Sequence, residues 1–182
     1  MRMNETIKRA QLGNKEAYLQ LIEHYHFTVE KFAYQCGVYP QDINDVTQEV
    51  FIKLYRFLHQ FNDSAFTTWL YKITLNTARD YYRKTTREQA RQQKLQAQPA
   101  HSVPTPEQHV LRFEEDQQIH TCIQALDEKY RYPIILFYFH ELRYEQIAEV
   151  LAINLSTVKV RILRAKAQLK VMLETEGKSS HG

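Results

Sequence analysis

Glycine and proline are scarce in this chain of 182 residues, which holds 4 glycines and 5 prolines. No glycine lies between Gly37 and Gly177, and proline within that span occurs only at positions 40, 99, 104, 106 and 133. Because these two residues are the strongest breakers of regular structure, their scarcity favours long helices. No strand-type alternation of comparable length is present. The sequence therefore predicts an all-α fold.

Cysteine and long apolar runs are also scarce. The two cysteines, Cys36 and Cys122, lie far apart and in no CxxC pair, which excludes a disulfide framework and a zinc knuckle. No apolar run reaches the ~18–20 residues of a membrane span, and the N-terminus lacks the apolar core of a signal peptide. We therefore expect a cytoplasmic protein without membrane insertion.

Catalytic motifs are missing as well. The chain has no glycine-rich phosphate loop, no nucleophile motif and no spaced carboxylate pair, so we predict no enzyme, no catalytic residues and no cofactor. His24, His26 and Cys36 are conceivable metal ligands. Two histidines on a helix surface and one core cysteine are the favoured interpretation, so no metal site is predicted.

Apolar residues recur at helical spacing in the first half of the chain. Pro40 followed by Asp42 indicates a helix start, with Gln41 or Asp42 near the N-cap. The spaced residues form three stripes: Leu19, Ile22, Val29, Phe32 and Ala33; Ile43, Val46, Val50, Leu54 and Leu58; and Phe66, Trp69, Leu70 and Ile73.

A stretch rich in Gln, Ala and Pro at about 85–105 lacks large apolar residues and indicates a flexible linker. Its first part consists of good helix formers, which favours a continuation of the preceding helix as far as Leu95. Apolar residues resume afterwards. We therefore expect two small helical domains, residues 1–90 and 107–176, with a linker at 91–106 and a disordered tail at 177–182. The resumed apolar residues are Val110, Phe113, Ile119, Ile123 and the stretch from Ile134 to Phe139.

Charge is sorted by segment, although the net charge is only +3. Residues 66–94 carry seven Lys/Arg against two acids, and residues 155–170 carry five Lys/Arg and no acid. Residues 107–128 have six acids against a single arginine. Two separate basic segments indicate two contacts with a polyanion such as nucleic acid, although a solvated helix face remains the alternative.

The second basic segment is typical of a helix-turn-helix. In the segment that begins at Tyr144, Ala148 sits where two helices approach closely, and a new helix is expected to begin near Ser156. Its early side chains would reach base edges in the major groove, and others would hold phosphates. A basic helical hairpin that serves only solubility is the alternative. The expected core positions are Leu151, Ile153, Val158 and Ile162; the expected base contacts are Lys159, Val160, Leu163 and Arg164; and the phosphate contacts are Thr157 and Arg161.

The first basic segment interleaves cations with aromatic residues, a combination that suits single-stranded DNA. Tyr71, Tyr81 and Tyr82 are either stacking platforms or core residues, and the sequence leaves both interpretations open. Trp69 shares the apolar spacing, which favours a core position. The cations Lys72, Arg79, Arg83, Arg87, Arg91 and Lys94 are spaced to lie near one helix face.

These motifs together resemble regions 2 and 4 of extracytoplasmic-function RNA polymerase sigma factors. The resemblance rests on DINDVTQEVFIKLYRFL, SAFTTWLYKITLNTARDYYRK, LRYEQIAEVL and STVKVRILRAKAQL, which occur in the family's order and cover nearly all of residues 14–173. It implies a protein that binds core RNA polymerase and directs promoter recognition, DNA melting and transcription initiation. An anti-sigma factor, membrane-bound or soluble, would be a further partner.

The resemblance also implies residue roles. One segment matches the family's docking site for the coiled coil of the largest polymerase subunit, a second matches the loop and helix that hold the melted -10 element, and a third matches the -35 contacts. They are, respectively, Asp45, Gln48, Glu49, Phe51 and Lys53; Asn62, Asp63, Ser64, Phe66, Asn76, Arg79 and Arg83; and Tyr144, Glu145, Thr157, Lys159, Val160, Arg161, Leu163 and Arg164.

Two positions depart from the family pattern. The loop FNDSAF is one residue shorter than usual and lacks its glycine, and Ala152 stands where the turn normally has glycine. A left-handed alanine there would cost about 1 kcal/mol.

The main rival interpretation is a transcriptional regulator with a sensor or dimerisation domain. Such a regulator would bind its operator alone, whereas a sigma factor binds promoter DNA well only within holoenzyme.

Overall fold

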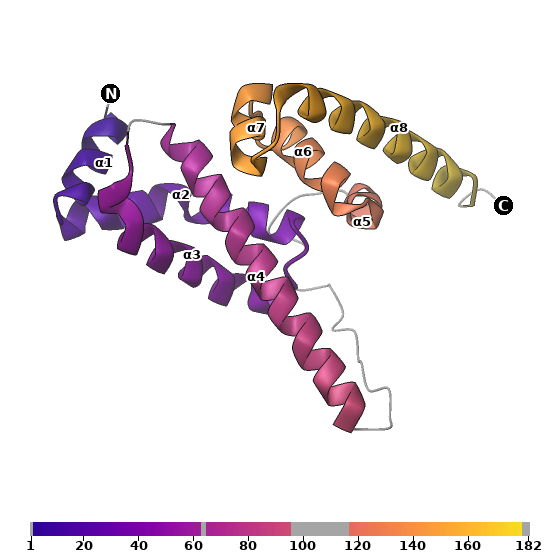
Figure 1. Cartoon of the computed structure of the whole chain (residues 1–182), viewed down its shortest axis with the longest axis horizontal. Helices are drawn as coiled ribbons and strands as arrows, with labels where there is room; N and C mark the ends of the chain where they lie inside the picture. Colours follow the sequence, from indigo (N-terminus) through magenta and orange to yellow (C-terminus); the bar gives the residue numbers. More distant parts are fainter. Residues whose placement is uncertain (1, 63–64, 96–116, 180–182) are drawn as a thin grey trace. The chain divides into compact units, whose positions relative to one another are not determined.

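The structure, a computed structural model, describes residues 2–62, 65–95 and 117–179. All regular structure in these ranges is helical, which confirms the all-α prediction (Figure 1). The chain divides into two compact units, Met1–His109 and Val110–Gly182. Residues 91–95 continue the last helix of the first unit, and the rest of the expected linker lies outside the described residues. Within the described ranges, no helix has the length and apolarity needed to cross a membrane.

The first unit is built from four α-helices and two short 3₁₀ turns within its described residues. Asn14 begins the second helix, since its side-chain oxygen accepts a hydrogen bond from the Ala17 amide at 2.8 Å. Gly37, at φ 98°, ends the same helix in a conformation that side chains disfavour. The elements are α1 (Arg2–Gln11), α2 (Lys15–Gln35), η1 (Pro40–Asp42), α3 (Ile43–Phe57), η2 (Leu58–Gln60) and α4 (Phe66–Leu95).

The core of the first unit forms where α2, α3 and α4 pack on one another (Figure 1). The stripe predicted for residues 43–58 is confirmed, since all five of its members are buried. In α2 the prediction is partly wrong, because Leu19 is 58% exposed and Leu21 is buried instead. Leu21 and Tyr25 lie one turn apart on the inner face, which leaves Leu19 on the outer one.

Asp42 precedes α3 at the N-cap position, but its side chain makes no capping hydrogen bond. Its carboxylate instead accepts a hydrogen bond from the Tyr81 hydroxyl of α4 at 2.5 Å. Burial, and next the Asp42 carboxylate, raise the pKa of the Tyr81 hydroxyl above its ordinary value, so it remains a donor. Asp42 thus ties the start of α3 to the middle of α4 rather than capping its own helix.

The second unit contains α5 (Gln117–Ala125), α6 (Glu128–Tyr138), α7 (Tyr144–Leu151) and α8 (Leu155–Ser179). Arg131 closes the turn between α5 and α6, because its guanidinium donates to the carbonyls of Gln124 at 2.9 Å and Leu126 at 2.8 Å. α8 packs on each of the other three helices. One core cluster of the second unit consists of Leu126, Ile134 and Ala165, with Tyr130, Leu169 and Met172 packed against them.

Two sequence expectations for the second unit need correction. Ile119 is exposed, whereas Ile123 is buried as expected; Val110 and Phe113 lie outside the described residues. The expected tail begins too early, because α8 continues to Ser179. A single glycine such as Gly177 costs a helix only about 1 kcal/mol and does not by itself end it.

The turn between α7 and α8 has a left-handed residue and a capping side chain. Ala152 ends α7 at φ 53° and ψ 46°, the conformation that glycine adopts without penalty. The helix start predicted near Ser156 is confirmed to within one residue, since α8 begins at Leu155. The capping side chain is that of Asn154, which accepts the Thr157 amide at 2.8 Å, and not that of Ser156. Asn and Ser are both good N-caps, and the earlier one starts the helix here.

Replacing Ala152 by glycine should raise the free energy of unfolding of the second unit by about 1 kcal/mol, since glycine removes the left-handed strain. Ala167→Gly, at an exposed interior position of α8, is the matched control and should lower it by about 1 kcal/mol. Urea unfolding followed by circular dichroism measures both. Equal destabilisation by the two glycines would contradict the strain at Ala152.

Candidate nucleic-acid interface

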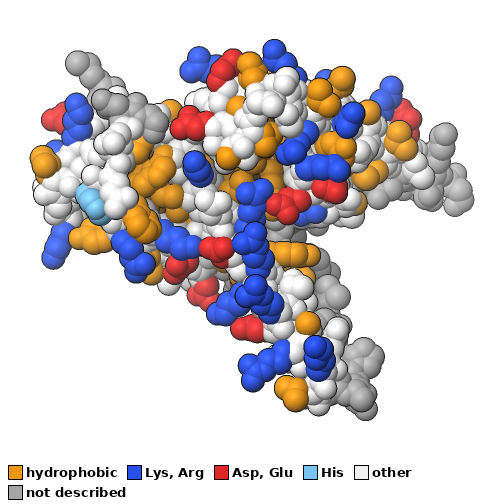
Figure 2. All heavy atoms as spheres, in the orientation of Figure 1, with side chains coloured by type: hydrophobic (Ala, Val, Ile, Leu, Met, Phe, Trp, Pro, Cys, Tyr) orange, Lys and Arg blue, Asp and Glu red, His pale blue; other side chains and the backbone are white. Residues whose placement is uncertain are grey.

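A row of cations follows one face of α4, and Figure 2 shows Lys and Arg side chains along this helix. The row comprises Lys72, Arg79, Arg83, Arg87, Arg91 and Lys94; Arg79 is half-buried and the others are exposed. Spacings of three, four and seven residues keep such side chains on one side of a helix. The first unit therefore presents a positive strip that runs along most of its longest helix.

The tyrosines of α4 have three different environments, which answers a question that the sequence leaves open. Tyr71 is buried in the core, and Tyr81 is half-buried with its hydroxyl bonded to Asp42. Tyr82 is 63% exposed. Among these three rings, Tyr82 is therefore the one available to stack on a base.

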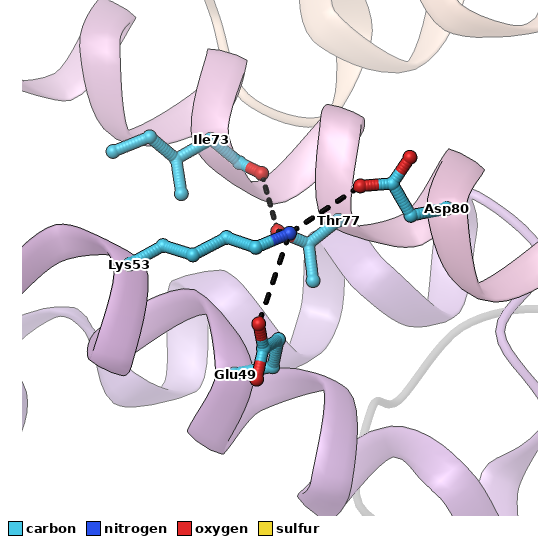
Figure 3. Close-up of polar contacts among 5 residues, drawn as sticks. All are labelled: Glu49, Lys53, Ile73, Thr77 and Asp80. Atoms are coloured by element: carbon cyan, nitrogen blue, oxygen red, sulfur yellow. Dashed lines mark hydrogen bonds and ion pairs between the residues drawn. The ribbon is translucent and has the colours of Figure 1, made fainter.

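Lys53 of α3 reaches across to α4, where one acid interrupts the cationic strip (Figure 3). Its Nζ lies 3.4 Å from the Asp80 carboxylate and donates at 3.4 Å to the Thr77 hydroxyl, which itself donates to the Ile73 carbonyl. Glu49, one turn back on α3, lies 3.9 Å from the same ammonium. Lys53 thus offsets the charge of Asp80 beside Arg79 and Arg83.

Three polar residues lie together on the outer face of α3, where Ile52 and Tyr55 are also exposed. Asp45, Gln48 and Glu49 are exposed, and they lie opposite Val46 and Val50, which are buried. This arrangement follows from the helical period, because a stripe that faces the core leaves the other face to solvent. The expected docking residues Asp45, Gln48 and Glu49 therefore share one accessible surface.

The chain between α3 and α4 is anchored by three aromatic rings. Phe61 stacks on Trp69, with ring centroids 5.1 Å apart, and meets Phe66 edge-on at 5.5 Å. Trp69 is only partly buried but packs against the core, as its spacing indicates. Asn62 is exposed, whereas Asp63 and Ser64 lie outside the described residues.

The second unit presents its own cationic face on α8. Lys159, Val160, Leu163 and Arg164 are exposed, whereas Thr157 and Arg161 are half-buried at the side of the helix. The buried residues Val158, Ile162 and Ala165 hold the opposite face to the unit, while Leu151 and Ile153 are only half-buried. On α7, Glu145 is exposed and the half-buried Tyr144 packs against Phe137 with ring centroids 5.1 Å apart.

Each unit matches the model of a known family. Residues 21–88 match Sigma-70 region 2, and residues 116–169 match Sigma-70, region 4. The ECF RNA polymerase sigma-E factor of Haemophilus influenzae is 34% identical over 174 residues, which cover 90% of this chain and 91% of that protein. The chain belongs to the extracytoplasmic-function family of sigma factors.

Other relatives of this sigma factor agree in sequence and fold. The RNA polymerase sigma-H factor of Pseudomonas aeruginosa is 33% identical over 180 residues, which cover 93% of each chain. A solved structure, the sigma factor RpoE with the anti-sigma factor NepR from Bartonella quintana, has a TM-score of 0.70 at 21% identity. It covers 86% of this chain and 96% of that one. The likeness supports the fold of this sigma factor.

Two residues that the resemblance assigns to binding lie in the core of this sigma factor. Phe51 and Phe66 are each 6% exposed. Phe51 points inward from α3 among the core residues, and Phe66 packs against Phe61 and Tyr25. Their rings therefore lie inside the unit, beneath the surfaces of α3 and of the start of α4. The helical period turns these two positions toward the core.

Two polar residues of the sigma factor are brought to the interface without having been predicted. Asp80 lies within the cationic strip, and the Gln11 amide of α1 donates to the carbonyl of Phe61, between α3 and α4. Both make contacts across more than 20 residues of sequence, which local patterns do not register.

Among the described residues, no three His, Cys, Asp or Glu are grouped so that they could hold a metal ion. His26 instead lies 3.6 Å from Glu30.

A double-mutant cycle on unfolding free energy tests the link between α3 and α4. Lys53→Met and Asp80→Asn should each have a small effect and should show a coupling of about 0.2–1 kcal/mol, as expected for a partly exposed ion pair. High salt should reduce the coupling. The same cycle with Glu49→Gln, whose contact is longer, should give a smaller value. No coupling at low salt would contradict the ion pair.

Proposed function

We propose that this sigma factor divides promoter recognition between its two units. In the first unit, the outer face of α3 docks on core RNA polymerase and the cationic strip of α4 holds the melted -10 strand. In the second unit, α8 enters the major groove of the duplex -35 element. The predicted domain limits, residues 1–90 and 107–176 joined by a linker at 91–106, give each unit its own contact.

The observation that carries this proposal is the separation of surface charge within the first unit. Asp45, Gln48 and Glu49 are exposed on α3, and the row of exposed cations lies on α4. A polyanion is attracted to the α4 strip and repelled by the acids of α3, so the two surfaces suit different partners. Asn76, Arg79 and Arg83 belong to α4, and Asn62 precedes that helix. These four described residues are the proposed -10 contacts.

The proposed division on α8 follows from the exposure of its side chains. Arg164 is exposed on the outward face with Lys159, Val160 and Leu163, where a helix in the major groove meets base edges. Arg161 and Thr157 are half-buried at the flank, where phosphates lie. On α7, Tyr144 and Glu145 are proposed to complete the -35 contacts.

The sigma factor acts in the cytoplasm in this proposal and catalyses nothing itself. The relative from Bartonella quintana was solved with an anti-sigma factor. An anti-sigma factor, soluble or membrane-bound, is accordingly proposed as a second protein partner.

A regulator that binds DNA alone is the alternative. Binding of the free chain to promoter duplex as tightly as the holoenzyme binds it would favour that alternative.

Reversing charge on the α3 face should abolish the complex with core polymerase. Asp45→Lys with Glu49→Lys places two cations where the partner is expected to meet acids, so the variant should no longer co-elute with core, while its helicity stays intact. The matched control is Glu16→Lys with Glu23→Lys, which makes the same charge change on exposed positions of α2. Unchanged co-elution of the α3 variant, or equal loss in the control, would refute the assignment.

Arg164→Ala and Arg161→Ala should differ in kind when variant holoenzymes select from a library randomised in the -35 element. Losing a base contact costs about 1–3 kcal/mol of discrimination and relaxes preference at one base pair. Losing a phosphate contact weakens all sequences alike and lowers the salt slope by about one. We therefore expect relaxed preference for Arg164→Ala and uniformly weaker binding for Arg161→Ala.

Lys170→Ala is the control for this selection, because Lys170 lies about four turns along α8 from its start. It should change neither the preferred sequence nor the salt slope. An unaltered preference for Arg164→Ala, or an altered one for Arg161→Ala, would overturn the orientation proposed for α8 in the groove.

A further inference from the structure

Helix α1 reaches the chain that leads into the -10 loop through one side chain. The Gln11 amide nitrogen donates to the Phe61 carbonyl at 2.8 Å and to the Leu58 carbonyl at 3.2 Å. Gln11 precedes the residues that match Sigma-70 region 2, which begin at position 21. The contact therefore joins the loop to a helix that the family match leaves out.

The two carbonyls lie where helical structure ends. η2 continues α3 to Gln60, and Phe61 then turns to an extended conformation at φ −68° and ψ 119°. Carbonyls at a helix C-terminus have no partner within the helix and need one from elsewhere. The Leu58 carbonyl accepts the Phe61 amide at 3.1 Å, and the Gln11 amide adds a second donor to it. Gln11 also supplies a donor to the Phe61 carbonyl, and so fixes the place where the chain leaves the helix.

The same place is fixed from the other side by aromatic rings. Phe61 stacks on Trp69 and meets Phe66, both at the start of α4. Gln11 thus holds the backbone of Phe61, while α4 holds its ring. A hollow of about 330 Å³ lies beside this point, and it is lined by Asn4, Lys8 and Gln11 of α1 together with Phe61, Ala65 and Phe66.

We propose that Gln11 is a positioning residue for the -10 loop, through its paired hydrogen bonds to the Leu58 and Phe61 carbonyls. This inference rests on the proposed function, in which the residues that follow Phe61 hold the melted -10 strand. The loop of this chain is one residue shorter than is usual in the family and has no glycine. Gln11 holds the carbonyl of Phe61, the first residue of this loop.

The test uses holoenzyme made from core polymerase and the full-length chain, on the promoter that the parent holoenzyme selects from a library randomised in both elements. Gln11→Glu keeps the size of the side chain but replaces the donor by an acceptor that both carbonyls repel. Permanganate reactivity of the melted -10 region should fall about fivefold or more, since the Phe61 carbonyl loses the donor from Gln11 and the Leu58 carbonyl loses its second donor. Co-elution with core and the preferred -35 sequence should not change.

Two further variants separate positioning from a general loss of stability. Gln11→Lys retains a long side chain with donors and should restore melting to at least half of the parent value. Tyr18→Phe removes another side-chain hydrogen bond to a backbone carbonyl of the same unit, that of Phe51, away from the loop. It should leave the preferred -10 sequence unchanged, whereas Gln11→Glu should relax it.

The remaining outcomes distinguish the inference from the proposed function. If Asn76→Ala impairs melting but Gln11→Glu does not, Gln11 does not position the loop although the function stands. If neither variant impairs melting, the -10 assignment and the inference fall together. If Tyr18→Phe relaxes the -10 preference as much as Gln11→Glu does, the effect is one of stability and the inference is wrong.

Discussion

The packing of α3 between α2 and α4 is the constraint on which the first unit depends. Val50 and Leu54 are fully buried, and removing a buried leucine side chain typically costs about 2–5 kcal/mol. Burying this stripe also fixes the rotation of α3, so that Asp45, Gln48 and Glu49 must face outward. The same packing sets the distance from α3 to α4, which is short enough for Lys53 of α3 to contact Asp80 of α4. Surface chemistry on the two helices is thus a consequence of one apolar seam.

Contacts between the α3 and α4 segments also offset the negative charge of acids near the cationic strip. Lys53 offsets Asp80 beside the cations of α4, and the Asp42 carboxylate is bonded by Tyr81. Asp80 and Asp42 are therefore each paired with a group from the other helix. Exposed ion pairs add only about 0–1 kcal/mol to stability, so the larger effect is on the field that a nucleic acid meets. The second unit reaches a similar result more simply, because no acid occurs in residues 155–170.

Sequence patterns predict the parts of this structure that local spacing determines. The buried stripe of α3, the helix-turn-helix and the left-handed Ala152 all follow from residues close in sequence. Leu19 misleads because α2 has apolar residues on two faces, and spacing alone does not say which face is buried. The resemblance does not reveal that Phe51 is buried, because it identifies a segment and not the direction of each ring, whereas the burial of Phe66 agrees with its apolar spacing. Gln11 and the partner of Lys53 escape prediction because their contacts join positions 50 and 27 residues apart.

The bond between Tyr81 and Asp42 also marks the point at which α4 leaves the support of its unit. Beyond Tyr81, none of the described residues of α4 is buried, although the helix continues to Leu95. This outer part of α4 is held in helical form by helix propensity and not by packing on a core. An unsupported helix of about 12–15 residues is marginal in water and frays as temperature rises. The distal cations Arg87, Arg91 and Lys94 should therefore lose their alignment gradually on warming, well below the cooperative melting of the core.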